Sequence, residues 1–214
     1  TWRFYPRTSE APTPTGLVRS LLTGGETVVV DLSSLGWDDP VKPLVIRELV
    51  SHLYYQSMRA YRRSGGANFN TLVVVEEAHR LVPPASWVSD REELKATRET
   101  LLRALTETRK AGLGWMFIST RISNLDRAVF EEARVKAVGM GLSSGEDAER
   151  IREAFGSEAL EYYRTFPDPT DPLSDTRHHA FLVSGPICVL RRGGAEFLEV
   201  YGSAEALLRA NGLK

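Results

Sequence analysis

The chain has 214 residues, of which 42% are hydrophobic and 26% are charged, a composition that excludes wholesale disorder. Its 27 basic and 28 acidic residues nearly cancel, so a large basic face for nucleic acid is not expected. No apolar run approaches the roughly 18 residues of a membrane span, and one cysteine excludes a disulfide framework. We therefore expect a cytoplasmic protein with no membrane partner.

The first half of the chain alternates between strand and helix patterns. A β-branched run at residues 26–32 predicts a buried strand, and the spacing of apolar residues predicts an amphipathic helix over residues 40–63. Residues 71–75 are almost entirely apolar, which is typical of a strand covered on both faces. Leucines from Leu94 onward predict a second amphipathic helix that ends near Lys110.

The second half continues this alternation. Strands are expected at residues 115–119 and 135–140, and Ser143 with Glu146 resembles a capping box that opens a helix ending at Gly156. Two short strands are expected from Ala180, broken at Gly185-Pro186 and followed by a turn at Gly193-Gly194. We predict an α/β fold, a mostly parallel sheet with helices on both faces and a short C-terminal β extension. The expected organisation is a lead-in segment, a core and an extension, at residues 1–20, 21–178 and 179–214.

Candidate chemistry is concentrated at Glu76 and Glu77, which directly follow the strand at residues 71–75. Open parallel sheets bind their ligands at the carboxyl ends of the strands. In a nucleotide-hydrolysing enzyme, the first carboxylate holds Mg²⁺ through water and the second orients and deprotonates the attacking water. The alternative is a pair of acids that merely begins a turn, and this string alone does not decide between the two.

Four segments in order resemble the HerA/FtsK superfamily of ring-shaped P-loop ATPases that move DNA. Residues 73–83, with Glu76-Glu77-Ala78-His79 and Pro83, resemble the Walker B segment of its HerA branch. Residues 108–114 resemble the end of the following helix, residues 118–126 resemble the next strand and loop, and residues 25–33 resemble the strand before Walker B. The chain thus resembles the second half of a RecA-like ATPase core.

The resemblance implies roles for individual residues. Glu76 would hold Mg²⁺ beside ATP, Glu77 would activate water, and Thr120 occupies the position that senses the γ-phosphate. Arg109 would be an arginine finger that acts on a neighbouring subunit, with Arg121 as the second candidate. The alternatives are a cation at a helix end for Arg109 and a solvated loop charge for Arg121. The implied assembly is a homo-oligomer, a hexameric ring around double-stranded DNA.

The sequence departs from the family pattern at two places. It contains no Gly-Lys pair, so the phosphate-binding loop Gly-x-x-x-x-Gly-Lys-[Ser/Thr] is absent. Thr120 replaces the usual glutamine, which shortens the reach of this side chain, and Ile122 replaces the usual proline. The chain opens at Thr1 without a methionine. A fragment, a split protein and a relative that lost the loop all fit, and alone the chain should bind ATP poorly.

Three functions follow as hypotheses. The first is a HerA-like ATPase that moves double-stranded DNA and works with a NurA-type nuclease on DNA ends. The second is another motor of the superfamily, for conjugation or phage packaging. The third is a non-catalytic assembly or regulatory domain. The chain is expected to be an active enzyme only if it is joined to an upstream phosphate-binding loop. Arg91, Lys95 and Arg98 fit either a DNA-binding pore or a subunit interface or, more simply, a solvated helix face.

Overall fold

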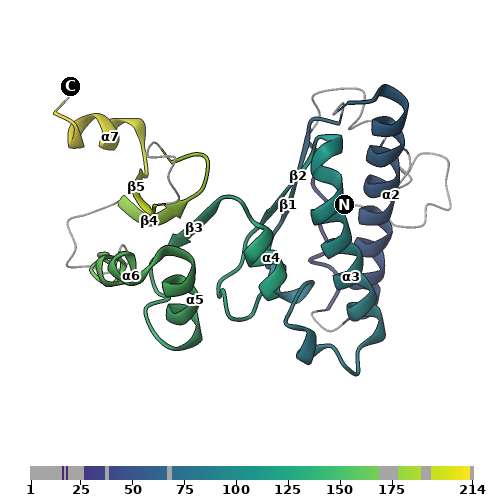
Figure 1. The fold of residues 1–214 in the computed structure, drawn as a ribbon, viewed down its shortest axis with the longest axis horizontal. Coiled ribbons are helices and arrows are strands. Elements are labelled where there is room, and N and C mark those ends of the chain that lie inside the picture. Colours follow the sequence, from purple (N-terminus) through teal and green to yellow (C-terminus); the bar gives the residue numbers. More distant parts are fainter. Residues whose placement is uncertain are drawn as a thin grey trace. The chain divides into compact units, whose positions relative to one another are not determined.

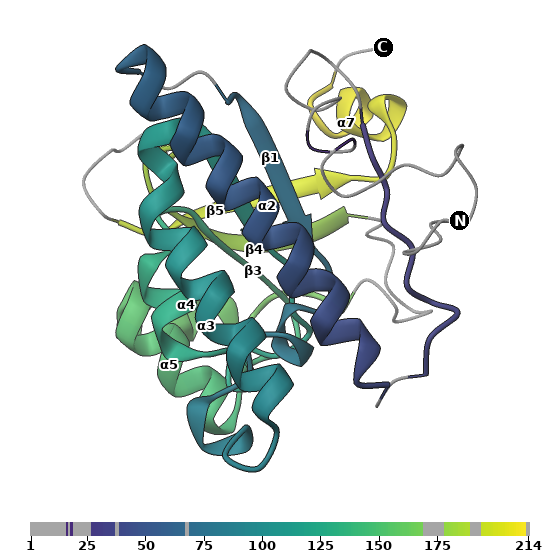
Figure 2. The same ribbon diagram turned by 90° about the vertical axis from the view of Figure 1, so that its right-hand side faces the viewer.

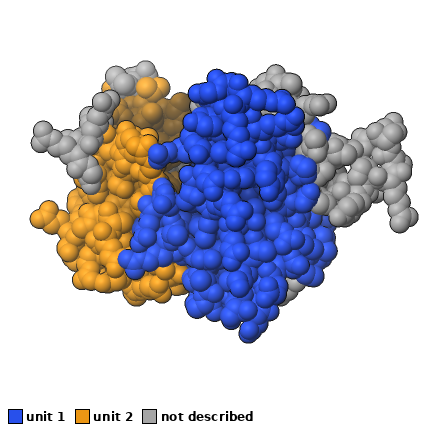
Figure 3. All heavy atoms as spheres, turned by 45° about the vertical axis from the view of Figure 1, so that its right-hand side comes forward, with its two compact units in different colours: residues 1–120, 124–132 blue, residues 121–123, 133–214 orange. Residues whose placement is uncertain are grey.

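The chain forms two compact units in a computed structural model (Figure 3). Unit 1 comprises residues 1–120 and 124–132, and unit 2 comprises residues 121–123 and 133–214. The predicted boundary between residues 178 and 179 therefore lies inside unit 2. The structure describes residues 16, 18, 27–36, 39–66, 69–168, 178–188 and 194–212, which leaves most of the predicted lead-in segment outside the described residues.

The first long element of unit 1 is α2 (Val41–Ser64), which confirms the predicted amphipathic helix. Its start is fixed by Asp39, whose Oδ1 accepts a hydrogen bond of 2.9 Å from the Val41 amide. Its end is fixed by Gly65, which adopts a left-handed conformation with φ of 68° that glycine reaches without a steric penalty.

A small parallel sheet lies beside this helix (Figure 1). It consists of β1 (Thr71–Val75) and β2 (Leu113–Phe117), with Val73 opposite Trp115. The connection contains η1 (Ala78–Arg80), η2 (Ala85–Trp87), α3 (Glu92–Glu107) and η3 (Thr108–Ala111). Unit 1 ends with α4 (Arg127–Glu132). The predicted strands and helix are thus confirmed, although β2 begins two residues before the predicted start.

One face of this sheet is covered by α2 and α3, which lie side by side (Figures 1 and 2). The buried residues Val50 of α2 and Leu101 and Ala104 of α3 form one cluster with strand side chains. The strand side chains that pack against the helices share one face, namely Val73, Val75, Trp115 and Phe117. Their packing against the buried helix residues contributes to the hydrophobic stabilisation of unit 1.

The opposite face of the sheet is exposed. Side chains alternate between the two faces of a strand, and the exposed set comprises Leu72 (61%), Val74 (49%), Met116 (49%) and Ile118 (41%). In the described part of the chain, the sheet therefore has helices on one face only. The α/β class is confirmed, but the prediction of a larger parallel sheet covered on both faces is wrong for these residues.

A second correction concerns the predicted strand at residues 26–32. Glu26 lies outside the described residues, and residues 27–32 form no strand. Val29 is 74% exposed, and a turn follows in which the Leu35 amide donates to the Leu32 carbonyl. A β-branched run forms a strand only where a neighbouring strand and a packed face are present.

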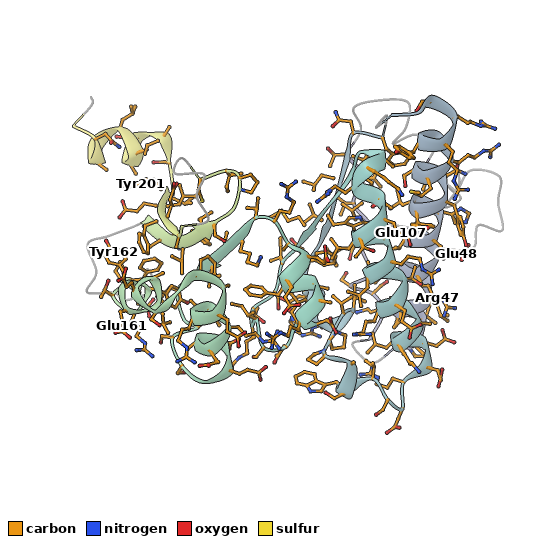
Figure 4. All side chains as sticks on the ribbon, in the orientation of Figure 1. Arg47, Glu48, Glu107, Glu161, Tyr162 and Tyr201 are labelled. Atoms are coloured by element: carbon orange, nitrogen blue, oxygen red, sulfur yellow. The ribbon has the colours of Figure 1, made fainter. Side chains whose placement is uncertain are left out.

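Polar contacts join α2 to α3 as well. Arg47 and Glu93 form an ion pair of 3.0 Å, and the Tyr54 hydroxyl donates to Glu107. The buried Thr97 hydroxyl donates to the Pro43 carbonyl at 2.9 Å. Figure 4 labels Arg47 on α2 and Glu107 on α3. These contacts fix the helix pair that supports the sheet.

Unit 2 contains an antiparallel sheet in the order β3-β4-β5. Its elements are β3 (Lys136–Gly139), α5 (Gly145–Phe155), α6 (Ser157–Tyr163), β4 (His178–Ser184), β5 (Glu196–Tyr201) and α7 (Ala204–Ala210). The predicted strand at residues 135–140 exists, but it pairs antiparallel with β4 rather than joining a parallel sheet. The first of the two predicted C-terminal strands is confirmed by β4. The second was expected between Gly185-Pro186 and Gly193-Gly194, where residues 189–193 lie outside the described residues, and β5 begins only at Glu196.

The start of α5 differs from the predicted capping box. Its N-cap is Ser144 rather than Ser143, and the Ser144 side chain makes no capping hydrogen bond. Its end at Gly156, with φ of 92°, agrees with the prediction. Nowhere in the described residues is a helix long and apolar enough to cross a membrane.

Candidate functional site

The two candidate carboxylates lie where the sequence places them, in the turn directly after β1. Glu76 is exposed, and the Glu77 side chain is 43% exposed. Glu77 adopts φ of 50° and ψ of 41°, and it is the one non-glycine residue with positive φ among those described. This left-handed conformation costs a non-glycine residue about 1–2 kcal/mol. Strain of this kind is found preferentially at functional sites.

Backbone hydrogen bonds hold this turn against the end of β2. The Ile118 amide donates to the Val75 carbonyl at 2.9 Å, and the Ala78 amide donates to the Ile118 carbonyl at 2.8 Å. Ala78 is fully buried. Ser119 and Thr120 therefore follow β2 at the same edge of the sheet as Glu76 and Glu77 follow β1.

Side chains connect the two strand ends directly. The Ser119 Oγ lies 3.2 Å from His79 Nδ1, and His79 Nε2 lies 3.5 Å from Glu77 Oε2. Arg80 Nε lies 3.8 Å from the same Glu77 oxygen. The Glu77 carboxylate is therefore flanked by two basic side chains of η1, and one of them contacts the neighbouring strand.

The residues at this edge fit one part of a nucleotide site. A hydrated Mg²⁺ needs one or two carboxylate ligands, with water and phosphate oxygens for the rest. Glu76, exposed at the strand end, is the carboxylate that fits this role. Within the described segments, no group of three or more His, Cys, Asp or Glu side chains could hold a metal ion.

The part of a nucleotide site that binds phosphate is missing from the sequence. Phosphates are cradled by backbone amides of a glycine-rich loop before a helix, together with its lysine. None of the 214 residues forms a Gly-Lys pair. The chain therefore places carboxylates and strand-end hydroxyls at this edge of the sheet without a loop of that sequence.

Arg109 lies away from the carboxylates within its own chain. It belongs to η3, which precedes β2, whereas Thr120 follows β2. The five residues of β2 rise about 16 Å. Arg109 is exposed at the amino end of the sheet, whereas Glu76 and Glu77 lie at the carboxyl end. Arg109 and the carboxylate pair of the same chain therefore lie at opposite ends of this sheet.

Arg121 belongs to unit 2 and forms an ion pair with α5 of the same unit. Its Nη1 lies 3.8 Å from Asp147 Oδ2 in the first turn of α5. The buried Asp147 also accepts a hydrogen bond of 2.7 Å from the Ser123 amide, and Arg150 donates to the Ile122 carbonyl at 3.2 Å. Residues 121–123 are thus attached to α5 immediately after Thr120.

Sequence reasoning missed two features of this region. Ser119 was not a candidate, although its place at the end of β2 was the available signal. Arg98 was interpreted as a pore or interface residue or as a solvated charge, and the solvated charge is wrong, because Arg98 forms a buried ion pair with Asp126. The signal for that pair was the uninterrupted helix pattern, which places Arg98 four residues after the buried Leu94.

Comparisons with known proteins find solved structures whose fold is similar to that of this chain. The complex of the genome packaging NTPase B204 from Sulfolobus turreted icosahedral virus 2 with AMPPCP matches at a TM-score of 0.53 and 15% identity, covering 84% of this chain and 69% of B204. The sulfate complex matches at 0.52 and 16% identity, covering 91% and 72%. No family model and no curated protein matches this chain. At such low identity, the likeness shows a shared fold.

Proposed function

We propose that this chain is the Walker B half of an ATP-driven motor that moves double-stranded DNA. The observation that carries this proposal is the pair Glu76-Glu77 at the carboxyl end of β1, beside the polar end of the parallel strand β2. The likeness to the fold of B204, a genome packaging NTPase whose complexes contain AMPPCP and ATP-gammaS, supports the same class of protein.

Each residue has a defined part in this proposal. Bound Mg²⁺ would stabilise the charge on the phosphoryl group that is transferred. Glu76 would hold that ion through its carboxylate. Glu77 would orient a water molecule and accept its proton. Thr120 would offer a hydroxyl donor at the strand end, with less reach than the glutamine of the resembling family.

Hydrolysis of ATP tests the proposal when the chain is joined to, or mixed with, the polypeptide that carries its phosphate-binding loop. Glu77→Gln removes the proton acceptor and should lower turnover by at least about a hundredfold. Glu131→Gln, an exposed carboxylate change on α4 of the same unit, is the matched control. Equal turnover of the wild-type protein and Glu77→Gln would contradict the proposal.

The isolated chain tests where the phosphate loop comes from. With no Gly-Lys pair, the 214 residues alone should not bind a fluorescent ATP analogue at micromolar concentration, and adding the loop-bearing polypeptide should create binding. Micromolar binding by the isolated chain would show that it holds phosphates by another route. Absence of hydrolysis with every added segment would leave the non-catalytic assembly domain as the function.

Arg109 is proposed to act on the carboxylate site of a neighbouring subunit in a hexameric ring. An arginine in this role contributes on the order of 10³-fold to the rate. Arg109→Ala should abolish turnover of the ring, and mixing it with Glu77→Gln should restore part of the activity, because some interfaces then contain both wild-type residues. No recovery at any mixing ratio would contradict action in trans. Arg121→Ala is the comparison for the second candidate.

Two branches of this motor class remain as finer proposals. The Glu76-Glu77-Ala78-His79 motif favours a HerA-like translocase with a NurA-type nuclease, whereas the fold of B204 favours a packaging motor. Co-purification with a nuclease encoded beside this chain, and stimulation of its DNA cleavage by ATP, would support the first. Stimulation of the ATPase by a viral capsid vertex protein would support the second.

A further inference from the structure

We propose that His79 is a positioning residue that fixes the Glu77 carboxylate through a polar relay from Ser119. The relay consists of Ser119, His79 and Glu77, and it joins the ends of β1 and β2. This inference rests on the proposed function, because positioning matters only if Glu77 activates water.

The relay uses both nitrogens of one imidazole ring. Nδ1 lies 3.2 Å from the Ser119 hydroxyl, and Nε2 lies 3.5 Å from Glu77 Oε2. The neutral tautomer that serves both contacts carries its hydrogen on Nε2, which faces the carboxylate, and accepts the serine hydroxyl hydrogen at Nδ1. Rotation of the ring about its own axis would therefore lose two contacts together.

The backbone under the ring is fixed independently. The Ala78 amide is bonded to the Ile118 carbonyl, and the Arg80 amide donates to the Glu77 carbonyl at 2.9 Å. The His79 side chain is only 15% exposed, whereas the Glu77 side chain is 43% exposed. A largely buried ring on a fixed turn is thus the rigid partner, and the glutamate is the side chain that needs to be held.

Arg80 is the competing partner of the same carboxylate oxygen. Its Nε lies 3.8 Å from Glu77 Oε2, and its side chain is 44% exposed. Exposed ion pairs contribute little because water screens them and long side chains lose entropy. His79 is less exposed and is attached to the neighbouring strand, so it is the stronger constraint on the position of Glu77.

Substitutions that keep one nitrogen position at a time test the relay. Glutamine places an amide near the position of Nε2, and asparagine places one near that of Nδ1. In the ATP-hydrolysing assembly, His79→Ala and His79→Asn should lower kcat about tenfold or more, with KM for ATP changed less than about twofold. His79→Gln should retain most of kcat, because an amide N–H still faces Glu77.

The control is His52, which pairs with Glu48 at 3.0 Å on α2, in the same unit but on a different element. His52→Ala should leave kcat unchanged. If His79→Ala, His79→Asn and His79→Gln all lower kcat equally, or none does, the relay is overturned. An active wild-type protein with an inactive Glu77→Gln variant would still support the proposed function in that case.

A second measurement does not need ATP hydrolysis. In thermal unfolding of the 214-residue chain, His79→Ala and Glu77→Gln should lower the midpoint together by less than the sum of the single changes, because they share one contact. Additive shifts would show that the contact is absent, which overturns the relay. A coupled pair in a protein without ATPase activity would instead overturn the proposed function and, with it, the positioning role.

Discussion

Arg98 on α3 and Asp126 before α4 form a buried ion pair, in which Asp126 Oδ2 accepts from Arg98 Nε at 3.0 Å and from Nη2 at 2.5 Å. Their side chains are 16% and 7% exposed. The other carboxylate oxygen accepts from the Ala128 amide, and the Asp126 amide donates to the Val82 carbonyl. One aspartate thus fixes the segment after Thr120 to the helix that supports the sheet.

Asp126→Asn should therefore destabilise unit 1 strongly. Removing one partner of a buried pair leaves the other charge uncompensated, which costs about 3–5 kcal/mol. Urea unfolding followed by tryptophan fluorescence measures this, since all four tryptophans have sequence positions in unit 1. Glu131→Gln breaks the exposed pair with Arg127 and should cost less than about 1 kcal/mol. Similar losses for both variants would contradict the burial argument.

Glu77→Gly should be more stable than Glu77→Ala, and both variants remove the proposed proton acceptor together with its contact to His79. Glycine adopts φ of 50° without the penalty that a Cβ incurs, although it also adds freedom to the unfolded chain. The net expected gain is about 0.5–1 kcal/mol. The reference variant is Glu77→Ala, which keeps the Cβ and also lacks the carboxylate. A glycine variant less stable than the alanine variant would show that the turn is not strained.

Gly185→Ala should unfold or severely destabilise unit 2. A Cβ on Gly185 would lie 2.2 Å from the Arg134 carbonyl oxygen, and its φ is 118°. Backbone crowding with a strained φ should cost about 2–4 kcal/mol. Gly141 in the same unit has φ of 105° and open space around its Cβ position, so Gly141→Ala measures the backbone strain alone. Equal losses in circular dichroism melts would contradict the predicted clash.

The reactivity of the Cys188 thiol measures how readily unit 2 opens. It is buried, and its Sγ lies 3.6 Å from the Val183 carbonyl. Burial raises the pKa of this thiol, and the negative charge of Glu196 raises it further. At pH 8, a thiol reagent should therefore react much more slowly with the folded chain than with the chain in urea.

The raised pKa of Cys188 predicts that the stability of unit 2 depends on pH. An unfolded cysteine loses its proton near pH 8.5, below the pKa of the folded thiol. The contribution of the protonated thiol to the free energy of unfolding is fully present below that pH and is lost as pH rises towards the folded pKa. Unit 2 should lose stability above about pH 8.5, and Cys188→Ala should remove that part of the loss. An identical alkaline loss in both proteins would contradict the assignment.

Much of the local structure followed from the sequence because its signals are local. Apolar spacing with Asp39 and Gly65 at the ends predicted α2, and the abrupt change from Val75 to Glu76 located the end of β1. The placement of Glu76 and Glu77 at a strand end needed no tertiary information. Their chemical roles stay predictions that rest on the family resemblance.

Strand partners did not follow from the sequence, because pairing joins residues far apart in the chain. Residues 27–32 have strand propensity but form no strand, whereas residues 136–139 form one in an antiparallel sheet. Propensity describes how a residue fits a pleated surface, and the fold decides whether such a surface is present.

Local signals were enough to predict the α/β alternation, the ends of α2 and the acidic strand end, because each depends on residues within one or two turns of chain. Tertiary contacts were needed to show that helices cover one face of the described sheet and that Arg109 and Glu77 lie at opposite ends of it. They were also needed to show that Ser119 and Glu77 contact the same histidine. These relationships depend on the register Val75–Phe117 between strands about forty residues apart.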